Sequence, residues 1–96
     1  MDEEHLIAKT KEVLIKRLQP SKIFLFGSRA KKTHSKNSDF DFAVDCKKPD
    51  LRLQRQVQEQ IEEFSGLFSV DIVYFSSIDE HFKKIIYKSG TIIYER

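Results

Sequence analysis

Acidic and apolar residues alternate in the segment Asp39–Asp45 (DFDFAVD). The segment contains the apolar residues Phe40, Phe42 and Val44 and the acids Asp39, Asp41 and Asp45. Because successive side chains of a strand point to opposite faces, a strand here would have one apolar face and one acidic face. Two ionised carboxylates roughly 7 Å apart repel by about 2 kcal/mol at an effective dielectric constant near 20. Carboxylate oxygens are good ligands for Mg²⁺ shared with phosphates, so we interpret this face as a cation site.

A further acid, Asp71, lies alone in the apolar segment SVDIVYF. An unpaired carboxylate is costly to bury, so this side chain should lie at a face or an end of a sheet. If the two strands are neighbours, Asp71 joins Asp39 and Asp41 in one cluster of three carboxylates. Two plainer interpretations stay open: solvation of an edge strand by the aspartates, and a salt bridge from Asp71 to a lysine. Asp45 lies farther along and is expected to be peripheral.

The junction Gly27-Ser28-Arg29 ends the apolar run KIFLF. Glycine allows a phosphate to approach the backbone, and the N–H groups of a helix start, a serine hydroxyl and a guanidinium all bind anions. The segment from Lys22 to Ser38 contains five basic residues and no acid: Lys22, Arg29, Lys31, Lys32 and Lys36. We therefore predict phosphate binding here, although a plain turn would also fit a Gly-Ser pair.

The pattern of the remaining chain predicts an α/β fold with a small mixed sheet of about four strands flanked by helices. We expect helices over about 3–18, 51–64 and 78–88, with a short one after Ser28. Strands are expected over 22–26, 39–45, 68–75 and 91–95. The inward residues are expected to include Ile7, Ala8, Leu14, Ile15 and Leu18 in the first helix and Phe82, Ile85 and Ile86 in the last. Residues 1–96 should form a single domain.

Several classes of protein do not fit the sequence. An EF-hand needs glycine at its sixth loop position and glutamate at its twelfth, where this chain has Val44 and Asp50. There is no G-x-G-x-x-G and no G-K-[ST]. The scattered histidines match no metal-ligand spacing, and no apolar run is long enough to span a membrane. A single cysteine fits a reducing compartment, so we expect a cytoplasmic protein.

The combination of Gly27-Ser28, ten intervening residues and Asp39-Phe40-Asp41 resembles the G-S-x10-D-x-D signature of minimal nucleotidyltransferases in the DNA polymerase beta-like superfamily. Asp71 matches the third acid of that pattern. The resemblance covers roughly residues 5–95. It implies that Asp39, Asp41 and Asp71 are catalytic and bind two Mg²⁺ ions. It also implies that Gly27 and Ser28, assisted by Arg29, hold the triphosphate.

The resemblance further implies transfer of a nucleoside monophosphate, expected to be AMP from ATP, to a hydroxyl with release of pyrophosphate. Proteins of this minimal type resemble the antitoxin of a toxin–antitoxin pair and can silence a HEPN-type toxin by adding AMP to it. The 96 residues contain no second domain that would position an acceptor, so we expect a partner protein or another copy of the chain to supply it.

Two other classes of function stay open. One is an interaction protein that binds its partner without catalysis. The other is a nucleic-acid-binding module that uses the basic residues 29–36, which the net charge of +2 and the lack of interleaved aromatic residues disfavour.

Overall fold

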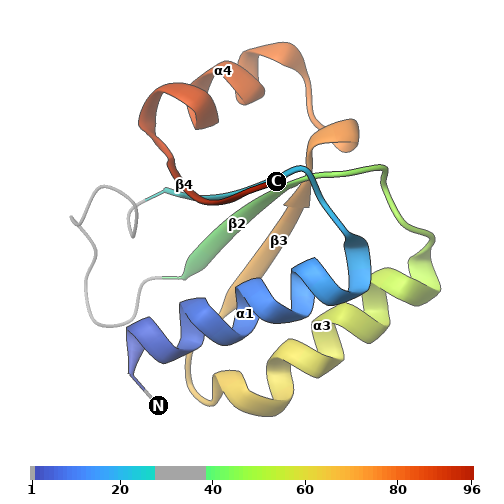
Figure 1. Ribbon diagram of the computed structural model, residues 1–96, viewed down its shortest axis with the longest axis vertical. Coiled ribbons are helices and arrows are strands. Elements are labelled where there is room, and N and C mark those ends of the chain that lie inside the picture. The colour runs from blue at the N-terminus through green and yellow to red at the C-terminus, as the bar shows by residue number, and fades with distance from the viewer. Residues whose placement is uncertain (1, 28–38) are drawn as a thin grey trace.

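The fold is a four-stranded mixed sheet with helices on both faces, as the computed structural model shows (Figure 1). The structure describes residues 2–27 and 39–96. Its elements are α1 (Glu3–Leu18), β1 (Lys22–Phe26), β2 (Phe40–Asp45), α3 (Leu51–Ser65), β3 (Val70–Tyr74), the 3-10 turn η1 (Phe75–Ser77), α4 (Glu80–Ser89) and β4 (Thr91–Glu95). The strand order is β3-β2-β1-β4, and only the β2–β3 pair is parallel. The predicted fold class is confirmed.

Each of the helices α1, α3 and α4 begins directly after an aspartate. The carboxylates of Asp2, Asp50 and Asp79 accept the backbone N–H of the third helical residue, in each case at 2.8 Å. This bond satisfies one of the free N–H groups at the helix start. The negative carboxylate also interacts favourably with the positive end of the helix dipole. Three of the acids in the sequence therefore have a local structural role, which separates them from the candidate site residues.

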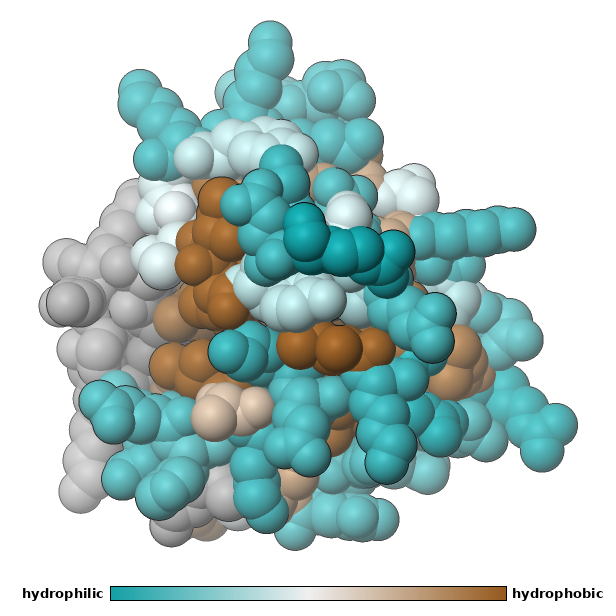
Figure 2. All heavy atoms as spheres, viewed as in Figure 1, coloured by the Kyte–Doolittle hydropathy of each residue, from teal (hydrophilic) through white to brown (hydrophobic). Residues whose placement is uncertain are grey.

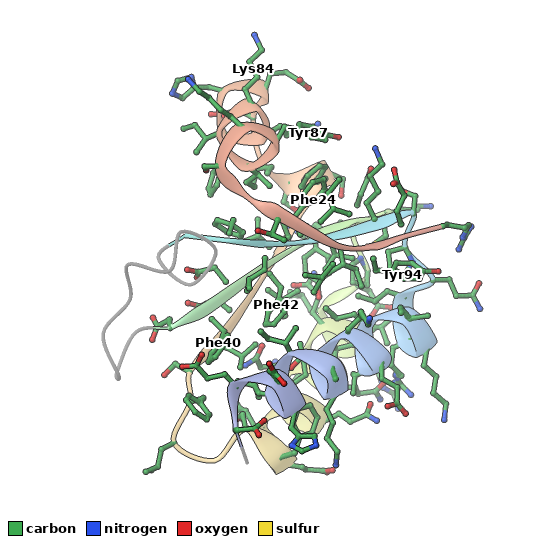
Figure 3. The ribbon with its side chains drawn as sticks, turned by 60° about the vertical axis from the view of Figure 1, so that its left-hand side comes forward. Phe24, Phe40, Phe42, Lys84, Tyr87 and Tyr94 are labelled. Atoms are coloured by element: carbon green, nitrogen blue, oxygen red, sulfur yellow. The ribbon has the colours of Figure 1, made fainter. Side chains whose placement is uncertain are left out.

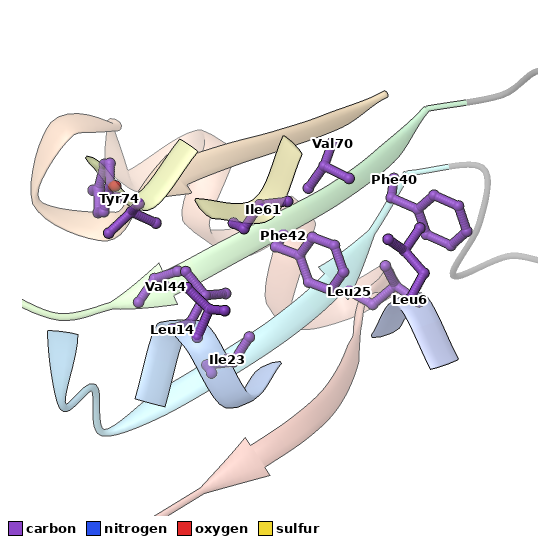
Figure 4. Packing of buried hydrophobic residues seen from close by; sticks show 12 residues of the cluster. Leu6, Leu14, Ile23, Leu25, Phe40, Phe42, Val44, Ile61, Val70 and Tyr74 are labelled. Atoms are coloured by element: carbon purple, nitrogen blue, oxygen red, sulfur yellow. The ribbon is translucent and has the colours of Figure 1, made fainter. Parts of the chain in front are cut away.

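The larger core lies between the sheet and helices α1 and α3. Phe40, Phe42 and Val44 of β2 are fully buried in it, together with residues such as Leu6, Leu14 and Ile61 from the helices (Figure 4). The predicted alternation of β2 is thereby confirmed on its apolar side. Burial of a large apolar side chain contributes roughly 1.5–3 kcal/mol, so this face holds β2 firmly in place.

A smaller core lies on the opposite face, under α4. It is formed by Phe24, Ala43, Phe75 and Ile86. The ring of Phe24 stacks on Phe75 at 5.4 Å and meets the edge of Tyr87 at 5.3 Å between centroids. Figure 3 shows Phe24 and Tyr87 on the α4 side of the sheet and Phe40 and Phe42 on the α1 side. The acidic face of β2 is thus the face on which α4 packs. Helix α4 covers Ala43 of this face, whereas Asp41 is only partly buried.

Several predicted boundaries were wrong by one or two residues. β2 begins at Phe40, so Asp39 precedes the strand, and β3 ends at Tyr74 because Phe75 starts η1. Helix α3 extends to Ser65, and α4 runs from Glu80 to Ser89 because Asp79 caps it. The predicted helix after Ser28 lies outside the described residues.

Some predicted inward residues were also wrong. In α1 the buried residues are Leu6, Thr10, Val13 and Leu14, whereas Ala8 is exposed. In α4, Ile86 is fully buried but Ile85 is 48% exposed. Hydrophobic residues do reach the surface on the face seen in Figure 2, among mostly hydrophilic neighbours. Within residues 2–27 and 39–96, no helix has both the length and the apolar character needed to cross a bilayer.

The neighbouring isoleucines of α4 provide a test of this packing. Ile86→Ala should lower the free energy of unfolding by about 2–5 kcal/mol, because it leaves a cavity beside Phe24 and Ala43. The matched change Ile85→Ala should alter it by less than about 1 kcal/mol, since that side chain is half exposed. Urea denaturation measures both, and equal losses would show that α4 packs differently.

Candidate active site

The strands β1, β2 and β3 bring their ends together at one end of the sheet. Asp41 of β2 pairs with Phe26, the last residue of β1, and on its other side with Asp71 of β3. Residues paired in register point to the same face, so Phe26, Asp41 and Asp71 form one row across three strands. The parallel pairing of β2 and β3 therefore brings together two acids that are far apart in the sequence.

Asp39 lies immediately before β2 and is exposed. The next residue is anchored, because the backbone N–H of Phe40 donates to the carbonyl of Ser69 at 2.9 Å. This bond fixes the start of β2 against the start of β3, so Asp39 is held near the row of Asp41 and Asp71. Asp45, at the other end of β2, pairs with Lys22 and lies away from this row, as expected.

Gly27 packs against the carboxylate of Asp41. Its φ of +76° lies in the left-handed region, which side chains other than glycine rarely adopt. A Cβ atom added to Gly27 would lie 2.6 Å from Oδ2 of Asp41, which is too close for a real contact. The turn therefore favours glycine here, and the Asp41 carboxylate would have to move to admit a Cβ atom.

The three carboxylates interact electrostatically. Partial burial, followed by the charges of Asp71 and Asp39, raises the pKa of the Asp41 carboxyl above its ordinary value. Within residues 2–27 and 39–96, no ion pair involves Asp39, Asp41 or Asp71. The site thus carries negative charge that its described neighbours do not neutralise, and a cation would relieve the repulsion.

The donor chemistry of these residues fits a divalent cation, because carboxylates are hard oxygen ligands. In the described part of the chain, however, no three acidic, histidine or cysteine side chains are already gathered as a metal centre. The protein supplies carboxylates on one row and beside it, so a bound cation would also need oxygen ligands from elsewhere.

The remaining predicted phosphate-binding residues, Ser28 and Arg29, lie outside the described residues, as do Lys31, Lys32 and Lys36. Of that predicted site the structure therefore describes Gly27 alone. Another feature was not predicted from the sequence, an open hollow of about 470 Å³ that has Asp71 in its lining. It is formed by the end of α3, the following turn and the start of β3, and no local pattern predicts such a combination.

Known proteins resemble this chain in sequence and in fold. Residues 8–96 match the family described as polymerase beta, nucleotidyltransferase. A Haemophilus influenzae protein described as probable protein adenylyltransferase MntA is 31% identical, over 98% of this chain and 82% of that protein. The family resemblance predicted from the G-S-x10-D-x-D signature is confirmed.

Solved structures share the fold. A crystal structure described as a toxin–antitoxin with AMP-PNP has a TM-score of 0.79 at 23% identity, over 99% of this chain and 75% of that chain. A complex of tri-AMPylated Shewanella oneidensis HEPN toxin with MNT antitoxin gives 0.75 at 18% identity, over 99% and 74%. A putative nucleotidyltransferase from Sulfolobus solfataricus gives 0.62 at 14% identity, over 96% and 79%.

The contact between Gly27 and Asp41 can be tested with a double-mutant cycle. Gly27→Ala should destabilise the protein by roughly 2 kcal/mol, from the positive φ and the clash with Oδ2. In an Asp41→Ala background the clash is absent, so the same change should cost about 1 kcal/mol less. Urea denaturation of the four proteins measures this difference, and additive effects would contradict the close approach.

The raised pKa of Asp41 predicts a pH-dependent effect of Asp41→Asn in metal-free buffer. A carboxyl with a higher pKa in the folded state holds its proton more tightly there, so the folded state loses stability as the pH rises through the two pKa values. Asp41→Asn should therefore stabilise the protein near neutral pH, by less than about 1 kcal/mol because solvent screens a partly exposed group. The gain in stability should vanish below pH 3.8, the ordinary pKa of the carboxyl. An equal gain at neutral pH and below pH 3.8 would assign it to another cause.

Proposed function

Because the chain belongs to the polymerase beta nucleotidyltransferase family, we propose that it transfers AMP from ATP to a hydroxyl group on a partner protein. The observation that carries this proposal is the row of Asp41 and Asp71, flanked by Asp39 and by the Gly27 turn. The row places negative charge at one end of the sheet, and the backbone of the Gly27 turn lies close to it. A metal–triphosphate complex needs both.

The family generally uses a divalent metal, and we propose two Mg²⁺ ions with Asp39, Asp41 and Asp71 as the protein ligands. Bound Mg²⁺ would supply neutralisation of the triphosphate and of the charge that develops in the transition state. Since the described residues contain no ready-made metal centre, this proposal requires that phosphate oxygens complete the coordination.

Residues of the chain itself would bind the phosphates and accept the proton of the hydroxyl. Gly27 is expected to hold the triphosphate through its turn, and Ser28 and Arg29 are expected to donate hydrogen bonds to the β- and γ-phosphates. The acceptor oxygen forms a bond to the α-phosphorus while the bond from that phosphorus to the bridging oxygen of pyrophosphate breaks. Asp71, which is exposed at the outer end of the row, would take the proton of the hydroxyl.

The relatives suggest the acceptor and the setting. One is described as a probable protein adenylyltransferase, and a structural neighbour is an antitoxin in complex with a tri-AMPylated HEPN toxin. We propose that a HEPN-type toxin is the acceptor here and that this chain, as one minimal nucleotidyltransferase domain in the cytoplasm, acts as the antitoxin. Self-association of the chain stays a prediction.

The test is adenylylation of a purified HEPN-type toxin with ATP and Mg²⁺, followed by intact-mass measurement. The wild-type protein should add AMP to the toxin. Asp71→Asn should lower the rate at least roughly hundredfold with ATP binding retained, because a proton acceptor acts mainly in the transition state. Asp41→Asn should lose ATP binding with Mg²⁺ as well as transfer.

Asp45→Asn is the matched control for these variants. Asp45 lies on the same strand but away from the row, so transfer should be normal. Toxin binding by the wild-type protein without any AMP adduct would instead favour the interaction protein without catalysis. Full activity of Asp71→Asn would remove that residue from the catalytic set.

A further inference from the structure

Strand β3 is one of the two outer strands of the sheet, and one of its edges has no strand partner among the described residues. The bond from Phe40 N–H to the carbonyl of Ser69 shows which backbone groups face β2. Because the N–H and C=O of one strand residue point to the same side, Asp71 and Val73 also face β2. The backbone groups of Val70, Ile72 and Tyr74 therefore face the open edge.

One of these outward groups already accepts a hydrogen bond from a side chain. Nε2 of Gln58, on α3, donates to the carbonyl of Val70 at 3.1 Å. The same nitrogen lies 3.3 Å from Oε1 of Glu62. The Val70 carbonyl on this edge is thus satisfied by a side chain rather than by another strand, and an added strand would have to displace that one bond.

Two hollows run along this edge, between β3 and α3. The hollow beside Asp71, of about 470 Å³, is lined by Val70 and by Glu62, and the second, of about 360 Å³, is lined by Ile72 and Tyr74. Gln58 lines both, so the hollows adjoin along the strand. The two hollows leave open space on either side of the Gln58 side chain, next to the outward backbone groups of Ile72 and Tyr74.

We propose that the acceptor polypeptide binds in an extended conformation along the outer edge of β3, as an added strand. This inference rests on the proposed function and names the docking site of its acceptor. Free N–H and C=O groups at a strand edge are matched by the backbone of another extended chain, and the hollows beside them take alternate side chains.

The register of the sheet explains why this edge suits an acceptor. A residue paired with Asp71 would have its side chain on the same face and about 4.8 Å away, so it would continue the row of Asp41 and Asp71. A hydroxyl at that position would lie next to the proposed proton acceptor. Because Glu62 and Asp71 line the near hollow, a basic residue close to the modified one should favour binding.

The test uses the HEPN-type toxin as acceptor and changes one backbone donor. Ile72→Pro removes an outward N–H, which an edge strand tolerates, and Ile72→Val keeps it. Ile72→Pro should raise the acceptor KM roughly tenfold, through the lost hydrogen bond and the added ring, while ATP affinity stays within about twofold. Ile72→Val should resemble the wild type, and urea denaturation shows whether each variant is folded.

A second pair of variants does not depend on proline. Gln58→Trp should fill the hollows from α3 and weaken binding of the toxin in buffer without ATP or Mg²⁺, whereas Glu59→Trp, on a residue that lines neither hollow, should not. A short peptide around the adenylylated residue, N-methylated at one backbone position at a time, should lose activity at alternate positions.

The outcomes separate the two proposals. No adduct on the toxin with the wild-type protein would overturn the proposed function and, with it, this docking site. A normal adduct together with unchanged acceptor KM in Ile72→Pro and Gln58→Trp would overturn the docking site alone. A wild-type dimer that either variant converts to a monomer would assign the edge to a second copy of the chain and also overturn it.

Discussion

Strand β2 is buried on one face and charged on the other, and this constraint shapes the rest of the fold. Phe40, Phe42 and Val44 have no exposed surface, so the strand cannot shift by one residue without moving three apolar side chains out of the core. The same alternation forces Asp41 to the opposite face. There α4 packs over Ala43, and Asp41 is left at the margin of that contact, only partly buried. An unpaired carboxylate under the helix would be far costlier, because a buried charge needs a partner. The position of the acid row thus follows from how much of the sheet α4 covers.

The site that results is electrostatically unfavourable on its own. The raised pKa of Asp41 reflects partial burial and the two acids beside it. Groups that destabilise the protein alone and bind a ligand well are common in active sites, since the geometry is optimised for the complex. The core beneath β2 is what holds the carboxylates in place against their repulsion, and the Gly27 turn lies directly beside the Asp41 carboxylate.

Alternation and local signals made much of this predictable. The two faces of β2 follow from the spacing of Phe40, Asp41 and Phe42, and Gly66 marks the end of α3. The start of α4 was missed because the cap at Asp79 was not recognised. Other features depend on contacts between distant segments. Ile85 looks as apolar as Ile86, and only the angle at which α4 lies on Phe24 decides which of them is buried. The pairing of Asp41 with Asp71 required the parallel register of β2 and β3, which no local pattern specifies, and so did the hollows along β3. The approach of Gly27 to Asp41 required the antiparallel register of β1 and β2.

The parallel pairing of β2 and β3 also has a kinetic consequence. These strands are joined by a crossover that contains all of α3, so Asp41 and Asp71 become neighbours only after a long loop has closed. Contacts between such distant segments form late and slow folding, whereas the α1 and α3 helices can form from local interactions. The acid row therefore depends on a contact that cannot form before the crossover has closed. A partly folded chain in which the two strands are not yet paired would therefore lack the row, even where helical turns have begun to form.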